Sequence, residues 1–408
     1  MDSRVVTNNT AGVRSYCRGI GATGVIYPAA LFSSFALGVV SLGIVFFARD
    51  VFGATPVQIG WLAGIWSMAY TLSCMLLRPV FSHFVPRSMI LTSAGLMCLF
   101  TLGIQFASSL TVVSICLALS GVAMSMFWPP LMAWLSDGHE GKSLGRRFSN
   151  YNIMWSIGTV ASPYICGWLA ERSARYPIFL GSVVFGITAV YILGTVLVLP
   201  NSGNGISQTE GIVSGIEPSE HETPIRFPAW IGLFASFFGL GALLSIFPLA
   251  AKEELHIAES TVGLLFLVRA LLGAIGFYII GRSVFWHFRM VPMLGVQFLM
   301  VICFGLLSMF GVSPKVIGGL FGMLAMLIAF SYSYSVFHGV SGCTDRVKRM
   351  AIHESVLSIG FISGSAAGGM LYEVSSMAHV YVMCALVLLV GIAAQYLVYQ
   401  IVRRRTAW

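Results

Sequence analysis

Arg269 is the residue of this chain best suited to binding chemistry, because it lies at the middle of the apolar stretch 260–281. A guanidinium group presents a planar fork of donors that matches a carboxylate or a phosphate. An arginine inside a membrane span normally faces a cavity and pairs with an anion. The apolar stretches hold no acidic residue at a similar depth. Two interpretations remain: Arg269 binds an anionic solute, or backbone carbonyls and a hydroxyl satisfy it in a structural role.

Aromatic and amide side chains in other apolar stretches form a second set of candidate substrate-binding residues. The run 127–130 contains two prolines. Each proline breaks a helical hydrogen bond, and the resulting kink would place an aromatic wall on a cavity. Tryptophan and tyrosine are also common in the belts at the two membrane surfaces, which need no ligand. The candidates are Phe127, Trp128, Asn152, Trp155, Tyr332 and Tyr334.

Charged side chains near the ends of the stretches are candidates for gating or proton coupling. His353 and Glu354 are adjacent at the start of one stretch, and histidine changes charge near neutral pH. The alternative is an interfacial pair in contact with water. Loop charges that recur loosely in the second half would latch a gate, or would be solvated residues that set the topology. These further candidates are Arg78, Asp137, Arg146 and Arg147.

An internal repeat indicates which elements position these residues. Segment 78–84 (RPVFSHF) returns as 282–288 (RSVFWHF), an offset of 204 residues. Segment 156–158 (SIG) returns as 358–360, an offset of 202. A nearly constant offset of half the chain indicates a duplicated unit. We therefore expect the functional site at the seam between two similar halves.

The composition indicates a membrane environment, since 57% of the residues are hydrophobic and only 9% are charged. A soluble domain carries roughly 25% charged residues. Alternating strand patterns are absent, so the membrane spans are predicted to be helices. Twelve apolar stretches are long enough to span: 25–48, 57–77, 89–108, 110–136, 148–170, 176–199, 228–250, 260–281, 290–311, 315–338, 350–373 and 378–402.

The basic residues are distributed unevenly over the connections. The two tails and the even-to-odd connections hold 17 Lys and Arg residues, whereas the opposite side holds 5. Basic loops face the cytoplasm, so both termini are predicted to be cytoplasmic. The net charge of +8 is then a topology signal and indicates no nucleic-acid partner. We expect a multi-pass protein of the cell (inner or plasma) membrane.

The sequence thus predicts an all-α integral membrane protein built from two parallel six-helix repeats. The predicted parts are a cytoplasmic tail (1–24), a first six-helix half (25–199), a flexible cytoplasmic linker (200–227), a second half (228–402) and a basic cytoplasmic tail (403–408). Small residues at intervals of four allow helix backbones to approach closely. We expect such contacts between the two halves, static or sliding, at Gly158, Pro163, Gly360, Gly364 and Gly368.

This architecture resembles the major facilitator superfamily of secondary transporters over nearly the whole chain. Arg78, Pro79 and Arg87 match the superfamily's loop between spans 2 and 3, although Ser82 and Pro86 replace its glycine and aspartate. The fifth span resembles the drug/proton antiporter motif at Gly158, Pro163 and Gly167. The resemblance implies halves that rock around a central site near the bilayer midplane, a small-molecule solute, a possible coupling proton, and a monomer.

The chain matches only in part the motifs that distinguish transporters of different substrates within the superfamily. Proton-coupled drug antiporters carry an arginine in span 4, where this chain has Leu117. Monocarboxylate transporters place an arginine in span 8, as Arg269 is placed, but pair it with an aspartate where this chain has Leu265. The chain lacks a complete nucleotide-binding or zinc-protease motif, so we expect no metal, no cofactor and no enzymatic activity.

Three functions remain open on this basis. The first is a secondary transporter of a small organic anion with Arg269 as the counter-charge. The second is an exporter of drugs or other lipophilic compounds, which the span 5 motif favours. The third is a membrane protein of this fold that transports nothing, which the altered loop between spans 2 and 3 favours.

Overall fold

The computed structural model describes residues 22–77, 84–136, 141–198, 223, 225–340 and 346–406. Within these ranges the only regular secondary structure is helical, and 12 helical segments are long and apolar enough to cross a membrane. The prediction of an all-α protein with twelve spans is therefore confirmed. Two predicted parts, the tail 1–24 and the linker 200–227, lie almost wholly outside the described residues, and the predicted division into domains stays a prediction.

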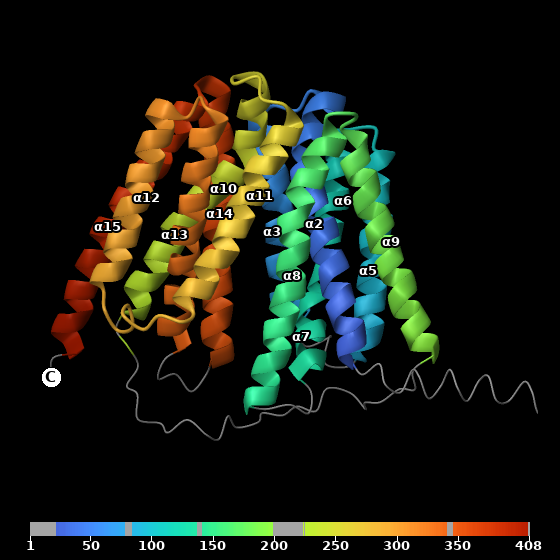
Figure 1. Cartoon of the computed structure of the whole chain (residues 1–408), viewed down its shortest axis with the longest axis horizontal. Coiled ribbons are helices and arrows are strands. Elements are labelled where there is room, and N and C mark those ends of the chain that lie inside the picture. Colours follow the sequence, from blue (N-terminus) through green and yellow to red (C-terminus); the bar gives the residue numbers. More distant parts are fainter. Residues whose placement is uncertain are drawn as a thin grey trace, which may run out of the picture.

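The helices fall into two groups that follow the chain. The first group comprises α2 (Ala22–Phe52), α3 (Pro56–Leu76), α5 (Pro86–Gln105), α6 (Leu110–Ser125), α7 (Trp128–Ser136), α8 (Gly141–Ala170) and α9 (Arg175–Val198). The second comprises α10 (Arg226–Glu253), α11 (Glu259–Ile280), α12 (Val291–Phe310), α13 (Pro314–Val340), α14 (Arg346–Val374) and α15 (Met377–Thr406). Figure 1 shows the first group, blue to green, beside the second, yellow to red.

Local signals explain several helix boundaries. The Thr55 hydroxyl accepts a hydrogen bond from the Gln58 amide nitrogen, and the Gln58 side chain accepts one from the Thr55 amide nitrogen at 2.9 Å. This reciprocal pair caps α3, which begins at Pro56 because proline needs no hydrogen-bond acceptor in the first turn. The fourth span is broken as predicted: α6 ends at Ser125, and α7 begins at Trp128, just before the two prolines.

Both described chain ends, Ala22 and Thr406, lie at the same end of the helix bundle (Figure 1). We call this end the terminal face and the opposite end the distal face. Helix α8 runs towards the distal face, whereas α11 and α13 run towards the terminal face. That the terminal face is cytoplasmic stays a prediction from the distribution of basic residues.

The predicted glycine contacts are real, but the structure places most of them within one half of the molecule. A Cβ atom at Gly360 or Gly364 would collide with backbone carbonyls of α10, and one at Gly158 would collide with α2. The expectation that these glycines form the contact between the halves is therefore wrong, since each pair of helices belongs to one half. Close packing inside a half holds the half together as one body.

A different set of small residues lies between the halves. The backbone of α3 at Gly60 packs against Ser365 of α14, and Gly369 of α14 packs against Pro56. On the other side of the molecule, Gly263 of α11 packs against Pro163 of α8, so Pro163 does lie at the predicted seam. All these contacts lie in the distal part of the four helices, where the two halves are therefore closed against each other.

Candidate functional site

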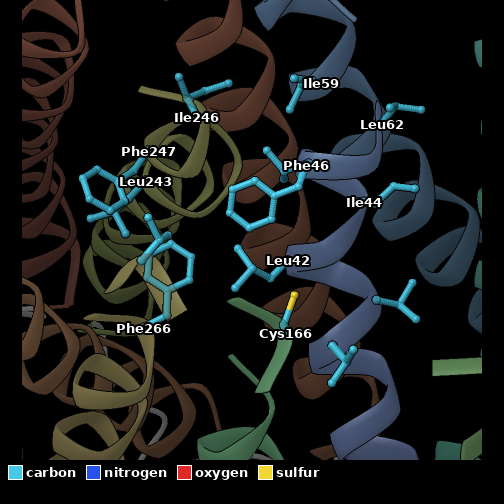
Figure 2. Packing of buried hydrophobic residues seen from close by; sticks show 14 of the residues in the cluster. Leu42, Ile44, Phe46, Ile59, Leu62, Cys166, Leu243, Ile246, Phe247 and Phe266 are labelled. Atoms are coloured by element: carbon cyan, nitrogen blue, oxygen red, sulfur yellow. The ribbon is translucent and has the colours of Figure 1, made fainter. Parts of the chain in front are cut away.

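An apolar plug closes the distal part of the seam. Leu42 and Phe46 of α2 point towards Leu243 and Phe247 of α10 (Figure 2). Phe266 of α11 lies beneath them and its ring centroid is 6.0 Å from that of Phe247. All these side chains are buried in one hydrophobic cluster that includes residues of both halves. We call them the distal plug.

Ion pairs lie above the distal plug, at the distal ends of α2 and α10. Arg49 pairs with Glu253, and Lys252 pairs with Asp50 at 2.7 Å. Lys252 also contacts Glu259 at the start of α11, at 2.8 Å. The first two pairs cross between the halves, and we call them the distal latch. Their side chains are about one third exposed, so each pair contributes modestly, roughly 0.2–1 kcal/mol.

The distal latch was not predicted from the sequence, although the repeat contains a signal for it. The latch pairs join residues 204 and 202 positions apart, because the dipeptides Arg49-Asp50 and Lys252-Glu253 stand about half the chain apart and pair crosswise. Each half thus ends its first helix with a basic residue followed by an acidic one. A symmetric pairing of repeat-related residues could have been inferred from these dipeptides, because equivalent helix ends meet near the axis that relates the halves.

The seam opens towards the terminal face. Residues 11 positions apart lie on the same side of a helix, since 11 residues make about three turns. In α8, Cys166 is 0% exposed, whereas Trp155 on the same side is 40% exposed. In α11, Phe266 is 4% exposed and Phe277 is 44% exposed. From this loss of burial we infer that the two halves are separated at this depth, and we call the region between them the open space.

The same change in burial occurs along α14. Ser365 is fully buried, and Glu354, 11 positions nearer the start of the helix, is exposed. Within the first half, a cavity of about 460 Å³ that is open to the surface lies on the terminal part of α2 and α8, and its lining is almost entirely apolar. Its lining residues are Thr23, Gly24, Tyr27, Pro28, Leu31, Phe32 and Met154.

Arg269 faces the interior of the protein. Leu264, Leu271 and Ile275 are exposed along one side of α11, which is the side that meets lipid. Arg269 is two residues before Leu271 and therefore lies nearly opposite it on the helix. Its guanidinium carbon is 5.8 Å from the ring centroid of Phe266, one turn nearer the distal face. Arg269 thus lies just below the distal plug.

The Arg269 guanidinium has no counter-ion among the residues that the structure describes. Its Nε atom is buried and lacks a hydrogen-bond partner. The side chain as a whole is partly exposed, and it lies on the side of α11 opposite Leu271. A charge in this position is expected to take its partner from a molecule that enters the open space.

His353 and Glu354 do not act as a pair, because they point in different directions. His353 is buried, with its Nδ1 3.0 Å from the Ser335 hydroxyl and its ring 4.9 Å from that of Tyr332. Glu354 is exposed and shares a side of α14 with Ser358, whose hydroxyl accepts a hydrogen bond from Thr71 of α3. The prediction that both residues meet water at an interface is therefore wrong for His353.

The remaining predicted substrate-binding residues divide into two sets. Asn152 and Trp155 of α8 are exposed on its inner side, and Trp128 and Tyr332 are partly buried. Phe127 is fully buried against Trp128 and the hydrophobic cluster, so it lines no open space. Tyr334 is also fully buried.

Tyr334 belongs to a separate aromatic cluster near the terminal face. Its hydroxyl donates to the Arg289 carbonyl at 2.9 Å, and its ring packs against those of Trp286 and Phe330. This hydrogen bond fixes the loop before α12 to α13. The expectation that Phe127 and Tyr334 contact substrate is corrected accordingly, because packing inside one half holds both rings.

Three of the six predicted gating or coupling residues cannot be compared with the structure. Arg78 and Asp137 lie outside the described residues, and the side chain of Arg146 is not described. Arg147 donates from Nη1 to the Leu135 carbonyl at 2.9 Å, which connects α8 to α7 within the first half. The gating roles therefore stay predictions. In the described ranges, no three His, Cys, Asp or Glu side chains gather in a way that could hold a metal ion.

Comparisons with known proteins agree with this architecture. A family model described as the Major Facilitator Superfamily matches residues 26–342. Multidrug resistance protein 2 of Bacillus subtilis (strain 168) is 21% identical over 289 residues, which cover 67% of this chain and 69% of that protein.

Two solved structures show a similar fold. One is a bacterial homologue of the human lysosomal transporter Spinster, inward-facing and unoccupied, with a TM-score of 0.69, 14% identity, and coverage of 95% of this chain and 97% of that one. The other, from work on substrate recognition in proton-dependent oligopeptide transporters, has a TM-score of 0.70 and 12% identity, and covers 94% and 99%. At such identities the likeness shows the fold alone.

Proposed function

This chain belongs to the Major Facilitator Superfamily and is a multi-pass membrane transporter, and we propose that its solute is a small organic anion that binds Arg269. The observation that carries the proposal is the guanidinium without a counter-ion below the distal plug. A carboxylate or phosphate in the open space would accept two parallel hydrogen bonds from it. It would also neutralise a charge that is costly in a dry interior.

The arrangement of the halves supports transport by alternating access. The distal plug and latch close one side, while the inner surfaces of α8, α11 and α14 are exposed towards the other. Rocking of the halves would separate Arg49 from Glu253 and Lys252 from Asp50, and would bring the terminal parts together. Arg269 is then reached from one face at a time, because it lies next to the point where the plug begins.

Export of lipophilic compounds is the second candidate, and a specific observation favours it. The cavity on α2 and α8 is lined by apolar and aromatic side chains, which suit a hydrophobic ligand without strict geometry. The Bacillus relative named above is a multidrug resistance protein. This candidate leaves Arg269 without a role, and we therefore rank it second.

The proposal can be tested by thermal unfolding of the purified protein with panels of monocarboxylates, neutral solutes and lipophilic cations. A ligand at 100 times its Kd stabilises the native state by about 2.7 kcal/mol. We expect carboxylates to stabilise the wild type and the control Arg172→Gln, whose arginine lies at the distal end of the first half, but not Arg269→Gln. Stabilisation of wild type and Arg269→Gln by the same cations, with no response to anions, would contradict it.

The unfolding temperatures of the wild type and Arg269→Gln without ligand distinguish a structural role of Arg269 from a binding role. If Arg269 has a structural role, its replacement leaves hydrogen-bond acceptors unpaired and lowers the unfolding temperature. If it serves a ligand, Arg269→Gln removes an uncompensated charge and leaves the unliganded protein at least as stable as the wild type.

A further inference from the structure

We propose that the transported anion also carries a cationic group, and that Glu354, together with the nearby rings of Tyr70 and Tyr332, binds that group. This inference rests on the proposed function, since it assigns the other end of the molecule that Arg269 holds. It predicts a zwitterionic solute, with the two charges at separate points of the same open space.

Glu354 faces the seam between the halves. On α14 it lies one turn before Ser358, which meets Thr71 of α3 across the seam at 2.9 Å. Ser365, on the same side of α14, packs against Gly60 of α3. The Glu354 carboxylate therefore lies on the side of α14 that is directed at the first half, one turn nearer the terminal face than the contact between Ser358 and Thr71. There it is exposed, and among the described residues it has no hydrogen-bond or ion-pair partner.

Two tyrosines, Tyr70 of α3 and Tyr332 of α13, lie near this carboxylate. Tyr332 packs against the ring of His353, the residue before Glu354, with centroids 4.9 Å apart. Tyr70 precedes Thr71, which contacts Ser358 one turn along α14 from Glu354. Tyr70 stacks on Trp66, with centroids 5.5 Å apart and ring planes 6° apart. The ring of Tyr332 is held by an edge contact with Phe277 at 5.6 Å. A carboxylate with tyrosine rings nearby offers both the charge and the π-faces that organic ammonium groups bind.

The depths of the two charges give the orientation of the solute. Tyr332, which is near Glu354, contacts Phe277 of α11. Phe277 is about two turns nearer the terminal face than Arg269 along the same helix. The anionic end therefore binds deeper, below the distal plug, and the cationic end binds nearer the terminal face.

The balance of charge explains why a solute with a single charge fits less well. When the space closes around a solute, each ion left without a partner loses water and costs several kcal/mol. A simple carboxylate compensates Arg269 and leaves Glu354 alone, and a simple ammonium compensates Glu354 and leaves Arg269 alone. A zwitterion compensates both.

The test uses full-length protein in detergent and isothermal calorimetry with three sets of probes. These are ω-aminocarboxylates of increasing chain length, the carboxylates that lack the amine, and the amines that lack the carboxylate. The variants are Arg269→Gln and Glu354→Gln. The matched controls are Arg172→Gln and Glu171→Gln, at the distal end of α8 outside the open space.

We expect one chain length of the aminocarboxylate series to bind wild type and both controls at least tenfold more tightly than the carboxylate or the amine of equal length. Glu354→Gln should lose that advantage and bind aminocarboxylate and carboxylate equally. Arg269→Gln should weaken both.

Two other results are informative. If Glu354→Gln binds every probe as the wild type does while Arg269→Gln binds none, the zwitterion proposal is overturned and the organic-anion proposal stands. If Glu354→Gln abolishes binding of amines and Arg269→Gln changes nothing, the organic-anion proposal fails and the solute is a cation.

Discussion

A single charge decides most of what can be said about the solute. Arg269 lies opposite the lipid-facing side of α11, contacts the Phe266 ring, and keeps its Nε atom buried without an acceptor. Desolvation penalises the charged form of a group whose partner is missing. The cost is tolerable only in a protein that often has a partner in place, which is why we interpret the residue as a binding group.

Replacement of Arg269 by lysine tests whether geometry or charge matters. Lysine keeps the positive charge but lacks the planar fork of donors. We expect Arg269→Lys to bind a carboxylate roughly tenfold more weakly than the wild type, since one of two charge-assisted hydrogen bonds is lost. Calorimetry on both proteins measures the ratio. Equal affinities would show that the guanidinium geometry is not used.

Arg269 was predictable from sequence, whereas the places of Tyr334 and Phe127 were not. A charge within an apolar stretch stands out against its neighbours. Aromatic residues do not, because lipid and protein interior are both apolar, and a membrane helix carries no polar stripe that marks its outer side. For the same reason the different environments of His353 and Glu354, which are adjacent in sequence, depended on the packing of α13 and α3.

At the scale of helices, the glycines belong to two kinds of contact with different consequences. Gly364 lies between α14 and α10, within one half, and Gly369 lies between α14 and α3, across the seam. The sequence predicted a close approach of helices at Gly360, Gly364 and Gly368. It did not predict which helix each glycine contacts, since spacing alone does not identify the partner helix.

Matched substitutions at these two glycines should separate folding from gating. Gly364→Ala places a Cβ atom against the Phe238 carbonyl, and we expect it to lower the unfolding temperature. The Cβ atom of Gly369→Ala would collide with the Pro56 carbonyl only when the distal side is closed. We therefore expect this substitution to increase the population of the state in which the distal side is open.

Alkylation of Cys166 by a maleimide measures how often the distal side opens, because this thiol is buried beside the distal plug when that side is closed. In a protein whose other cysteines are replaced by serine, Gly369→Ala should accelerate the reaction severalfold. Unchanged alkylation in Gly369→Ala, with a lowered unfolding temperature, would mean that the contact serves folding only.

The whole molecule is held in its present state by the distal plug and the distal latch together. The plug supplies apolar burial between the halves, and the latch adds two crossed ion pairs that are one third exposed. Exposed pairs are weak individually and are screened by salt. They therefore bias the equilibrium between the two states of the transporter and do not lock it.

Charge reversal tests the latch at this scale. Arg49→Glu places two glutamates against each other, and their repulsion should increase the rate of Cys166 alkylation. Adding Glu253→Arg should return this rate towards that of the wild type. The interaction energy of the double-mutant cycle should be roughly 0.2–1 kcal/mol and should fall as salt is raised. Additive effects of the two substitutions would show that Arg49 and Glu253 are not coupled.

The crossed arrangement of the latch also bears on the origin of the fold. A helix that ends in a basic residue followed by an acidic one is self-complementary about a two-fold axis, because the basic residue of each copy pairs with the acidic residue of the other. Arg49-Asp50 and Lys252-Glu253 retain that order in both halves. Two identical six-helix subunits could have closed against each other through the same contacts, so the latch is compatible with an ancestral homodimer that preceded the fusion of the halves.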